Sequence, residues 1–262
     1  MADTVVVTGG GRGIGRAIAL AFAGEGARLV LGDVEREVDG VADEARALGA
    51  RAVALRADVT RSEDMRGLAA RAVDEFGSLD VLVTCAGIGG GGLLLEQDEG
   101  DWIRVVDVNL NGTYRAIRAA LPRMMAQGQG RIITISSVYG RMGGSSFITA
   151  YAASKHGVIG LTRALAAEVA SQGFPEITVN AICPGYVRAG MGLGLQKVRS
   201  KEGVVTEVPG HEVFERHFKR RVPQRRMIEA EEIAHAALFL ARSATRGITG
   251  QALNVDGGFV MS

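Results

Sequence analysis

Two side chains past the middle of the chain could exchange a proton with a substrate. Tyr151 and Lys155 are four residues apart in the segment Tyr-Ala-Ala-Ser-Lys, so a helix would place both on one face. An ammonium beside a phenol favours the phenolate, which predicts a pKa for Tyr151 below the ordinary value of about 10. Such a group transfers protons efficiently near neutral pH. An inconsequential surface pair is the competing interpretation.

Two serines precede this pair at the end of a predicted strand, Ser136 and Ser137. A hydroxyl at the carboxyl edge of a parallel sheet lies where ligands bind, and it could polarise a carbonyl oxygen. Ser137 is the better candidate, because Ser136 is farther along the chain from Tyr151.

A glycine-rich turn, Thr-Gly-Gly-Gly-Arg-Gly-Ile-Gly over 8–15, follows the first predicted strand. Glycines allow the backbone to approach a pyrophosphate closely, and the N–H groups of the following helix would hold the anion. A tight turn without a ligand is the alternative, but the strand-turn-helix context favours binding. The residues predicted to line the phosphates are Gly9, Arg12, Gly13, Ile14 and Gly15.

Acidic residues follow the next two strands. Asp33 could accept hydrogen bonds from both adenosine ribose hydroxyls, and it would repel a 2′-phosphate by roughly 1 to 4 kcal/mol per close charge pair. This favours NAD over NADP, although Arg12 and Arg36 are near enough to weaken the preference. A solvated helix N-cap is the alternative for Asp33. Asp58 and Val59 could contact adenine, or Asp58 could cap the helix that follows; both interpretations stay open.

Composition limits the class of protein. The chain has 262 residues, 47% of them hydrophobic, and a net charge of +1, so nothing suggests binding to nucleic acid or to anionic lipid. The start has no secretory character, and no apolar run approaches the roughly 20 residues of a membrane span. Cys85 and Cys183 are expected to be reduced thiols in a cytoplasmic protein. Neither they nor the four histidines have metal-ligand spacing, so no metal site is predicted; the histidines are His156, His211, His217 and His235.

Strand and helix patterns alternate along almost the whole chain, which predicts one doubly wound α/β domain over 1–262 with a parallel seven-stranded sheet, a Rossmann fold. The predicted strands are Thr4–Thr8, Arg28–Gly32, Ala52–Arg56, Leu79–Thr84, Arg131–Ser136, Ile177–Cys183 and Ala252–Val255. The predicted helices are Ile14–Gly24, Arg36–Leu48, Ser62–Phe76, Asp101–Ala126, Ala150–Ser171 and Ala230–Ala241. The stretch 189–226 has no strong period and predicts an irregular substrate flap.

Over essentially its whole length the chain resembles the short-chain dehydrogenase/reductase family. The resemblance lies in the glycine-rich turn, Asp33, the Tyr-x-x-x-Lys segment and several shorter motifs, which are Ala86-Gly87, Asn109 within Val-Asn-Leu-Asn-Gly, Ser137, Pro184-Gly185 and the tail 250–258. It implies hydride transfer between a nicotinamide and a carbonyl or alcohol carbon. The chain departs from the family at Thr84-Cys85, where Asn-Asn is usual, and at Ala189, where a threonine is common.

The resemblance also implies residue roles. Tyr151 would be the general acid/base, Lys155 would lower its pKa and hold the nicotinamide ribose, and Ser137 would orient the substrate oxygen. Tyr151 and Lys155 would both contact the cofactor. Asn109 would position a water in a proton relay. The residues that would line the cofactor through their backbones are Cys85, Ala86, Gly87, Pro184, Gly185 and Val187.

These observations predict an NAD(H)-dependent dehydrogenase or ketoreductase for a secondary alcohol/ketone pair. An NADP(H)-dependent 3-oxoacyl reductase of fatty-acid or polyketide type is the alternative, and a non-catalytic dinucleotide sensor is another. The resemblance implies a homotetramer, with 150–171 and the last strand between subunits. A basic cluster in the flap would form a solvated face with Glu212 and Glu215 or recognise an anionic substrate tail; it comprises Arg216, Lys219, Arg220, Arg221, Arg225 and Arg226.

Overall fold

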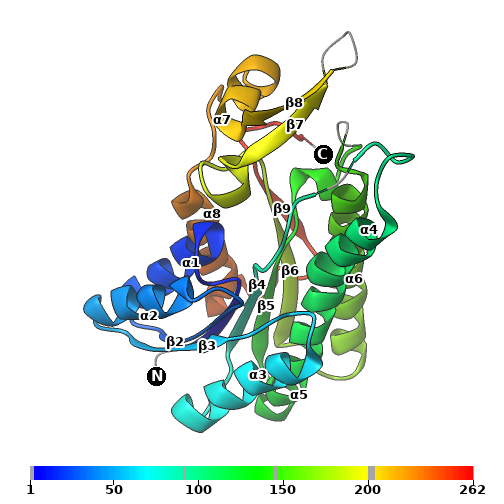
Figure 1. The fold of residues 1–262 in the computed structure, drawn as a ribbon. Helices are drawn as coiled ribbons and strands as arrows, with labels where there is room; N and C mark the ends of the chain where they lie inside the picture. Colours follow the sequence, from blue (N-terminus) through cyan, green and yellow to red (C-terminus); the bar gives the residue numbers. More distant parts are fainter. Residues whose placement is uncertain (1–2, 91, 144–146, 200–203, 262) are drawn as a thin grey trace.

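A seven-stranded parallel sheet forms the centre of the molecule, with the strand order β3-β2-β1-β4-β5-β6-β9 (Figure 1). The computed structural model describes residues 3–90, 92–143, 147–199 and 204–261. The strands are β1 (Thr4–Thr8), β2 (Arg28–Asp33), β3 (Arg51–Arg56), β4 (Val81–Thr84), β5 (Gly130–Ile135), β6 (Ile177–Pro184) and β9 (Ala252–Val255). The predicted doubly wound parallel sheet is confirmed.

Helices cover both faces of this sheet, because alternate residues of each strand point to opposite sides. Val5 and Val7 of β1 belong to the core beneath α1 and α8, whereas Val6 belongs to the core beneath α3 and α5. Figure 1 shows α1, α2 and α8 on one side and α3, α5 and α6 on the other. The helices are α1 (Gly13–Gly24), α2 (Glu37–Ala47), α3 (Ser62–Phe76), α4 (Glu99–Val106), α5 (Gly112–Gln127), α6 (Thr149–Ser171), α7 (Gly210–Val213) and α8 (Ala230–Ala241).

The strand order reverses at β1, which pairs with β2 on one side and β4 on the other. In open α/β sheets ligands bind at the carboxyl ends of strands at such a reversal. Thr8 ends β1 opposite Gly32 of β2 and Thr84 of β4, so the glycine-rich turn begins at this point.

The predicted helix Asp101–Ala126 is interrupted. Between α4 and α5 the chain makes a π-helical turn, η1 (Asp107–Asn111), and the helical segment begins earlier, at Glu99. A π-turn holds one extra residue without ending the helix, so the chain stays helical from Glu99 to Gln127.

The predicted flap is more regular than its sequence pattern suggested, and its role over a substrate stays a prediction. The described part of 189–226 contains an antiparallel hairpin, β7 (Leu195–Arg199) and β8 (Val205–Pro209), followed by α7 and a second π-turn, η4 (Phe214–Phe218). Residues 200–203 of the predicted flap lie outside the described residues. Short 3-10 turns are η2 (Val138–Gly140), η3 (Gly190–Gly192) and η5 (Ser243–Thr245). Among the described helices, none has the length and apolar character that a membrane crossing requires.

Candidate active site

The glycine-rich turn brings two stretches of backbone together too closely for any side chain. Gly9 has a φ of +70°, and a Cβ there would lie 2.6 Å from the Cα of Ala86. A Cβ on Gly15 would lie 1.9 Å from the carbonyl oxygen of Gly9. Both positions therefore require glycine, and the turn closes against the loop after β4.

The beginning of α1 fits a phosphate group. Its N-cap, Arg12, is extended and exposed, no side chain caps the helix, and the first turn has no acidic residue. The first N–H groups of a helix need acceptors, and an anion is favoured there by the helix dipole. Gly13, Ile14 and Gly15 form this first turn, and their contact with the pyrophosphate of a dinucleotide stays a prediction.

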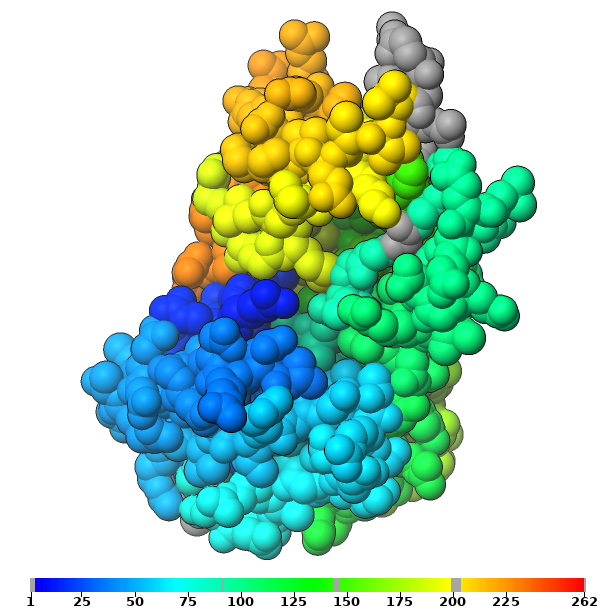
Figure 2. Space-filling model, in the orientation of Figure 1, coloured from blue at the N-terminus to red at the C-terminus, as the bar shows by residue number. Residues whose placement is uncertain are grey.

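The flap covers the same turn. A Cβ on Gly13 would lie 3.6 Å from Gly190, and one on Gly89 would lie 3.2 Å from the sulfur of Met191. The segment after β6 thus spans from the glycine-rich turn to the loop after β4, and Figure 2 shows it in yellow above the dark blue amino-terminal residues.

Asp33 points its carboxylate at the glycine-rich turn. Its Oδ2 accepts a hydrogen bond from the backbone N–H of Gly11 at 2.9 Å, and its Oδ1 accepts one from the backbone N–H of Glu35 at 3.2 Å. Helix α2 has Arg36 as its N-cap, so the alternative in which Asp33 caps that helix is wrong. Arg12 and Arg36 are both exposed.

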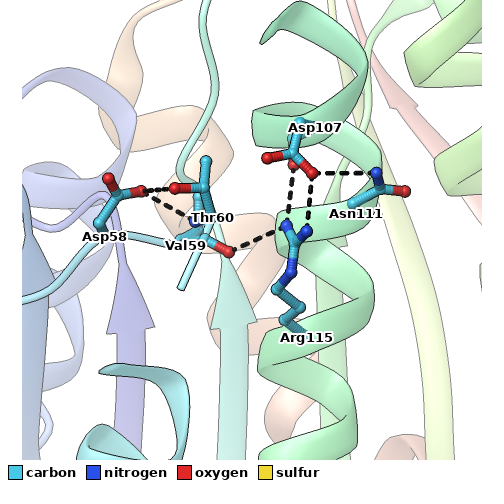
Figure 3. Close-up of polar contacts among 6 residues, drawn as sticks. All are labelled: Asp58, Val59, Thr60, Asp107, Asn111 and Arg115. Carbon is cyan, nitrogen blue, oxygen red and sulfur yellow. Dashed lines mark hydrogen bonds and ion pairs between the residues drawn. The ribbon is translucent and has the colours of Figure 1, made fainter. Parts of the chain in front are cut away.

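Asp58 stabilises a turn rather than the helix that follows. Its Oδ1 accepts hydrogen bonds from the backbone N–H and the hydroxyl of Thr60, both at 2.8 Å (Figure 3). Arg61 is the N-cap of α3, so the helix-cap interpretation of Asp58 is wrong. Val59 is only 6% exposed and packs closely on Gly112 of α5.

Arg115 ties this turn to the π-turn η1. Its guanidinium donates to the carbonyl of Val59 at 3.5 Å and to the Asp107 carboxylate at 2.7 Å, and Asn111 donates to the same carboxylate oxygen at 3.0 Å (Figure 3). The loop after β3 and the segment that carries Asn109 are therefore held together.

Asn109 is fully buried in η1, and its side chain joins two other elements. Its Oδ1 accepts from the N–H of Ile88 at 2.8 Å, and its Nδ2 donates to the Ile88 carbonyl and to Ser154 Oγ of α6, both at 3.0 Å. Both Nδ2 hydrogens are used, so this amide braces the loop after β4 against α6 and has no hydrogen left for a water.

Ser137, Tyr151 and Lys155 come together at the end of β5. Ser137 forms a hydrogen bond with Tyr151, and the Nζ of Lys155 lies 5.7 Å from the centre of the Tyr151 ring. Lys155 is 4% exposed and donates to the carbonyl of Ile135 at 2.8 Å. Ser136 points elsewhere and donates to the Lys155 carbonyl at 2.9 Å, which leaves Ser137 as the serine of the group.

The expected lowering of the Tyr151 pKa is wrong for the protein alone. Burial raises the pKa of Tyr151 to about 12, and the hydrogen bond with Ser137 only partly offsets this. Burial also lowers the pKa of Lys155 to about 8. Burial disfavours the charged form of each group, which is the phenolate of Tyr151 and the ammonium of Lys155. At neutral pH Tyr151 is therefore a protonated phenol, which holds its proton more tightly than an ordinary tyrosine does.

Backbone groups complete the surroundings. Cys85 and Ala86 donate to the carbonyl and the hydroxyl of Thr8, at 3.1 and 3.4 Å, so the loop after β4 follows the edge of the glycine-rich turn. A Cβ on Gly87 would lie 3.5 Å from Lys155 Nζ. Burial raises the pKa of the Cys85 thiol to about 12, and both cysteines are unpaired.

The segment after β6 is anchored to the end of the chain and to the loop before α8. Pro184 ends β6, Gly185 donates to the carbonyl of Val255 at 3.0 Å, and Val187 pairs with Ile228. These contacts hold the base of the flap beside the carboxyl ends of the strands.

Half of the basic cluster forms ordinary ion pairs. Glu212 pairs with Arg216, Glu215 with Lys219, and Glu232 with Arg226. Arg221 lies over the rings of Phe218 and Phe259. The ion pairs favour the solvated-face interpretation for Arg216, Lys219 and Arg226.

Sequence reasoning missed one pair of side chains at this site, Tyr139 and Tyr186, whose hydroxyls form a hydrogen bond at 2.5 Å. Their positions beside Ser137 and Pro184-Gly185 were the available signal, but 47 residues separate them and no local pattern indicates that they meet.

Comparisons with known proteins agree with this geometry. A family model described as enoyl-(acyl carrier protein) reductase matches residues 9–260. The 3-oxoacyl-(acyl-carrier-protein) reductase FabG of Staphylococcus aureus is 37% identical over 263 residues, covering 100% of this chain and 99% of that protein. Oxidoreductase UcpA of Salmonella typhimurium is 37% identical over 258 residues, covering 97% and 93%.

Solved structures give the same assignment. A variant of actinorhodin polyketide ketoreductase with NADPH aligns with a TM-score of 0.88 at 36% identity, covering 98% of this chain and 97% of that one. With a family model and relatives that span nearly its whole length, the chain belongs to the short-chain dehydrogenase/reductase family, and it is an oxidoreductase acting on CH–OH or ketone groups.

Proposed function

We propose that this protein reduces the ketone of a 3-oxoacyl substrate to a secondary alcohol. The observation that carries the proposal is the Tyr151 phenol, protonated at neutral pH and hydrogen-bonded to Ser137 beside Lys155. An acid in this position suits reduction, because the carbonyl oxygen must gain a proton. Relatives named 3-oxoacyl reductase and polyketide ketoreductase support this substrate class better than a general alcohol dehydrogenase.

Each residue of the Ser137–Tyr151–Lys155 group has its own role in the reduction. Ser137 donates a hydrogen bond to the ketone oxygen, and Tyr151 transfers its proton to that oxygen as the carbon is reduced. The Lys155 ammonium stabilises the phenolate that forms. A nicotinamide dinucleotide, when bound, supplies the hydride. The glycine-rich turn would hold its pyrophosphate, and Asp33 its adenosine ribose.

The test is reduction of a 3-oxoacyl thioester, followed at 340 nm with NADH and with NADPH, beside a panel of isolated ketones. Faster turnover of the 3-oxoacyl thioester than of the isolated ketones would support the proposal. Tight dinucleotide binding without turnover of any carbonyl would instead favour the sensor alternative.

We also propose that Asp33 selects NADH, although the ketoreductase relative was solved with NADPH. Its carboxylate is fixed by Gly11 and Glu35 and would lie against a 2′-phosphate. Asp33→Asn removes the charge, so the ratio of kcat/KM for NADH to that for NADPH should fall by roughly ten- to a hundredfold. Asp39→Asn removes the same charge at an exposed position of α2, so it should leave the ratio unchanged. A wild-type preference for NADPH would contradict the proposal.

The pKa of Lys155 gives an expected pH dependence. With a pKa lowered to about 8, its ammonium is present below that pH and is lost above it, whereas Tyr151, at about 12, stays protonated. The kcat/KM for reduction should be level up to about pH 7.5 and then fall through one ionisation near pH 8. The variant Lys155→Arg keeps its positive charge at this pH. It should have a lower kcat/KM than the wild type, but that kcat/KM should not fall near pH 8. An unchanged wild-type rate up to about pH 10 would refute this role.

Assembly into a homotetramer remains a proposal from the family resemblance, with α6 and β9 between subunits. Light scattering measures the assembled mass directly.

A further inference from the structure

A second pair of hydroxyls lies beside the Ser137–Tyr151 pair. Tyr139 follows Ser137 by two residues, in η2, and its N–H donates to Ser137 Oγ at 3.1 Å. Tyr186 follows Pro184-Gly185 at the end of β6. The two tyrosine hydroxyls are 2.5 Å apart, so a loop on the core is joined to the base of the flap.

Aromatic packing fixes the position of these hydroxyls. The Tyr186 ring lies 4.4 Å from that of Phe218 and 5.7 Å from that of Phe214, centre to centre, and it meets the Tyr139 ring edge-on at 6.4 Å. Such contacts limit the rotation of both tyrosines.

The Tyr139–Tyr186 pair has one O–H hydrogen that its own hydrogen bond does not use. Each hydroxyl has one hydrogen to donate and two lone pairs. Within the pair one hydroxyl donates to the other, so one O–H hydrogen finds no acceptor among the residues that the structure describes. Both tyrosines are half-buried. The pair is therefore a placed donor with one hydrogen available to an incoming oxygen.

We propose that the Tyr139–Tyr186 pair binds the second carbonyl oxygen of a 1,3-dicarbonyl substrate, while Ser137 and Tyr151 bind the ketone oxygen. This rests on the proposed function, because a 3-oxoacyl thioester carries such an oxygen two carbons from its ketone. An isolated ketone has no group for the pair, so the pair sets specificity rather than the chemical step.

The test compares two substrates in several variants. Acetoacetyl-N-acetylcysteamine serves as the 1,3-dicarbonyl and 2-hexanone as the isolated ketone. The double variant Tyr139→Phe/Tyr186→Phe, which removes both hydroxyls, should lower kcat/KM for the dicarbonyl about tenfold, chiefly by raising KM, and change that for 2-hexanone less than twofold. Phenylalanine keeps the ring packing and the backbone N–H to Ser137. Tyr114→Phe, at an exposed tyrosine on α5, is the matched control and should change neither.

The outcomes separate this inference from the proposed function. Equal losses on both substrates, or no loss on the dicarbonyl, would overturn the inference even if the wild type reduces 3-oxoacyl thioesters well. A wild type that reduces only 2-hexanone would overturn both. If 2-hexanone is not reduced at all, a tenfold rise in KM for the dicarbonyl with kcat unchanged in the double variant supports the inference, and a fall in kcat instead overturns it; Tyr114→Phe should show neither.

Discussion

Replacing Tyr151 by Phe is expected to lower kcat for ketone reduction by about a thousandfold, within the range that a single general acid contributes. The phenol of Tyr151 is the acid that is hydrogen-bonded to Ser137 beside Lys155, and phenylalanine has no proton to give. The fold should persist, because the ring keeps its packing and only one hydrogen bond, with Ser137, is lost. Steady-state turnover at 340 nm measures the loss.

Dinucleotide binding separates a chemical defect from a structural one. NADH or NADPH should bind Tyr151→Phe with nearly wild-type affinity in a fluorescence titration, because Tyr151 is distant in sequence and role from the glycine-rich turn. Tyr114→Phe serves as the surface control. Turnover within threefold of the wild type would remove Tyr151 from the mechanism.

Gly15→Ala is expected to abolish measurable dinucleotide binding, a loss of a hundredfold or more, and to destabilise the protein by several kcal/mol. The added methyl would lie 1.9 Å from the Gly9 carbonyl oxygen, and that atom belongs to a backbone segment already pressed against Ala86. The turn must open to admit the methyl, which displaces the N–H groups at the start of α1. Thermal unfolding and dinucleotide titration measure the two effects.

Gly24→Ala gives a matched control in the same helix. A Cβ there meets nothing within 4 Å. Alanine at an exposed helical position is favoured over glycine by about 0.5–1 kcal/mol, so this variant should unfold at the same or a higher temperature and bind dinucleotide normally. If both alanine variants bind alike, the close approach at Gly15 is not what shapes the site.

Much of the fold was predictable because its signals are local. The runs Thr4–Thr8 and Ala252–Val255 and the helices Ser62–Phe76 and Ala230–Ala241 have their predicted bounds. The hairpin β7–β8 was missed because its strands pair only with each other. Several of its apolar residues are exposed, among them Leu195 at 67%, so no alternation against a core marks it.

The sequence predicted which residues form the site better than it predicted their protonation. The Tyr151 and Lys155 positions follow from spacing on a helix, and Ser137 from the end of a strand. The raised pKa of Tyr151 and the lowered pKa of Lys155 come from burial by distant segments, which a four-residue spacing does not report. The two interpretations of Asp58 could not be separated from sequence, because the choice depends on which N–H groups its carboxylate meets.

The π-turn at 107–111 constrains the number of residues between α4 and α5 as strongly as it constrains which residues stand there. Because a π-turn accommodates one extra residue, deleting one residue here would leave a regular α-helix, with α4 and α5 in their present orientations. Asn109 would then turn away from Ile88 and Ser154, and the brace between the loop after β4 and α6 would be lost. Insertions and deletions in homologous sequences should therefore avoid this segment, even where substitutions accumulate freely.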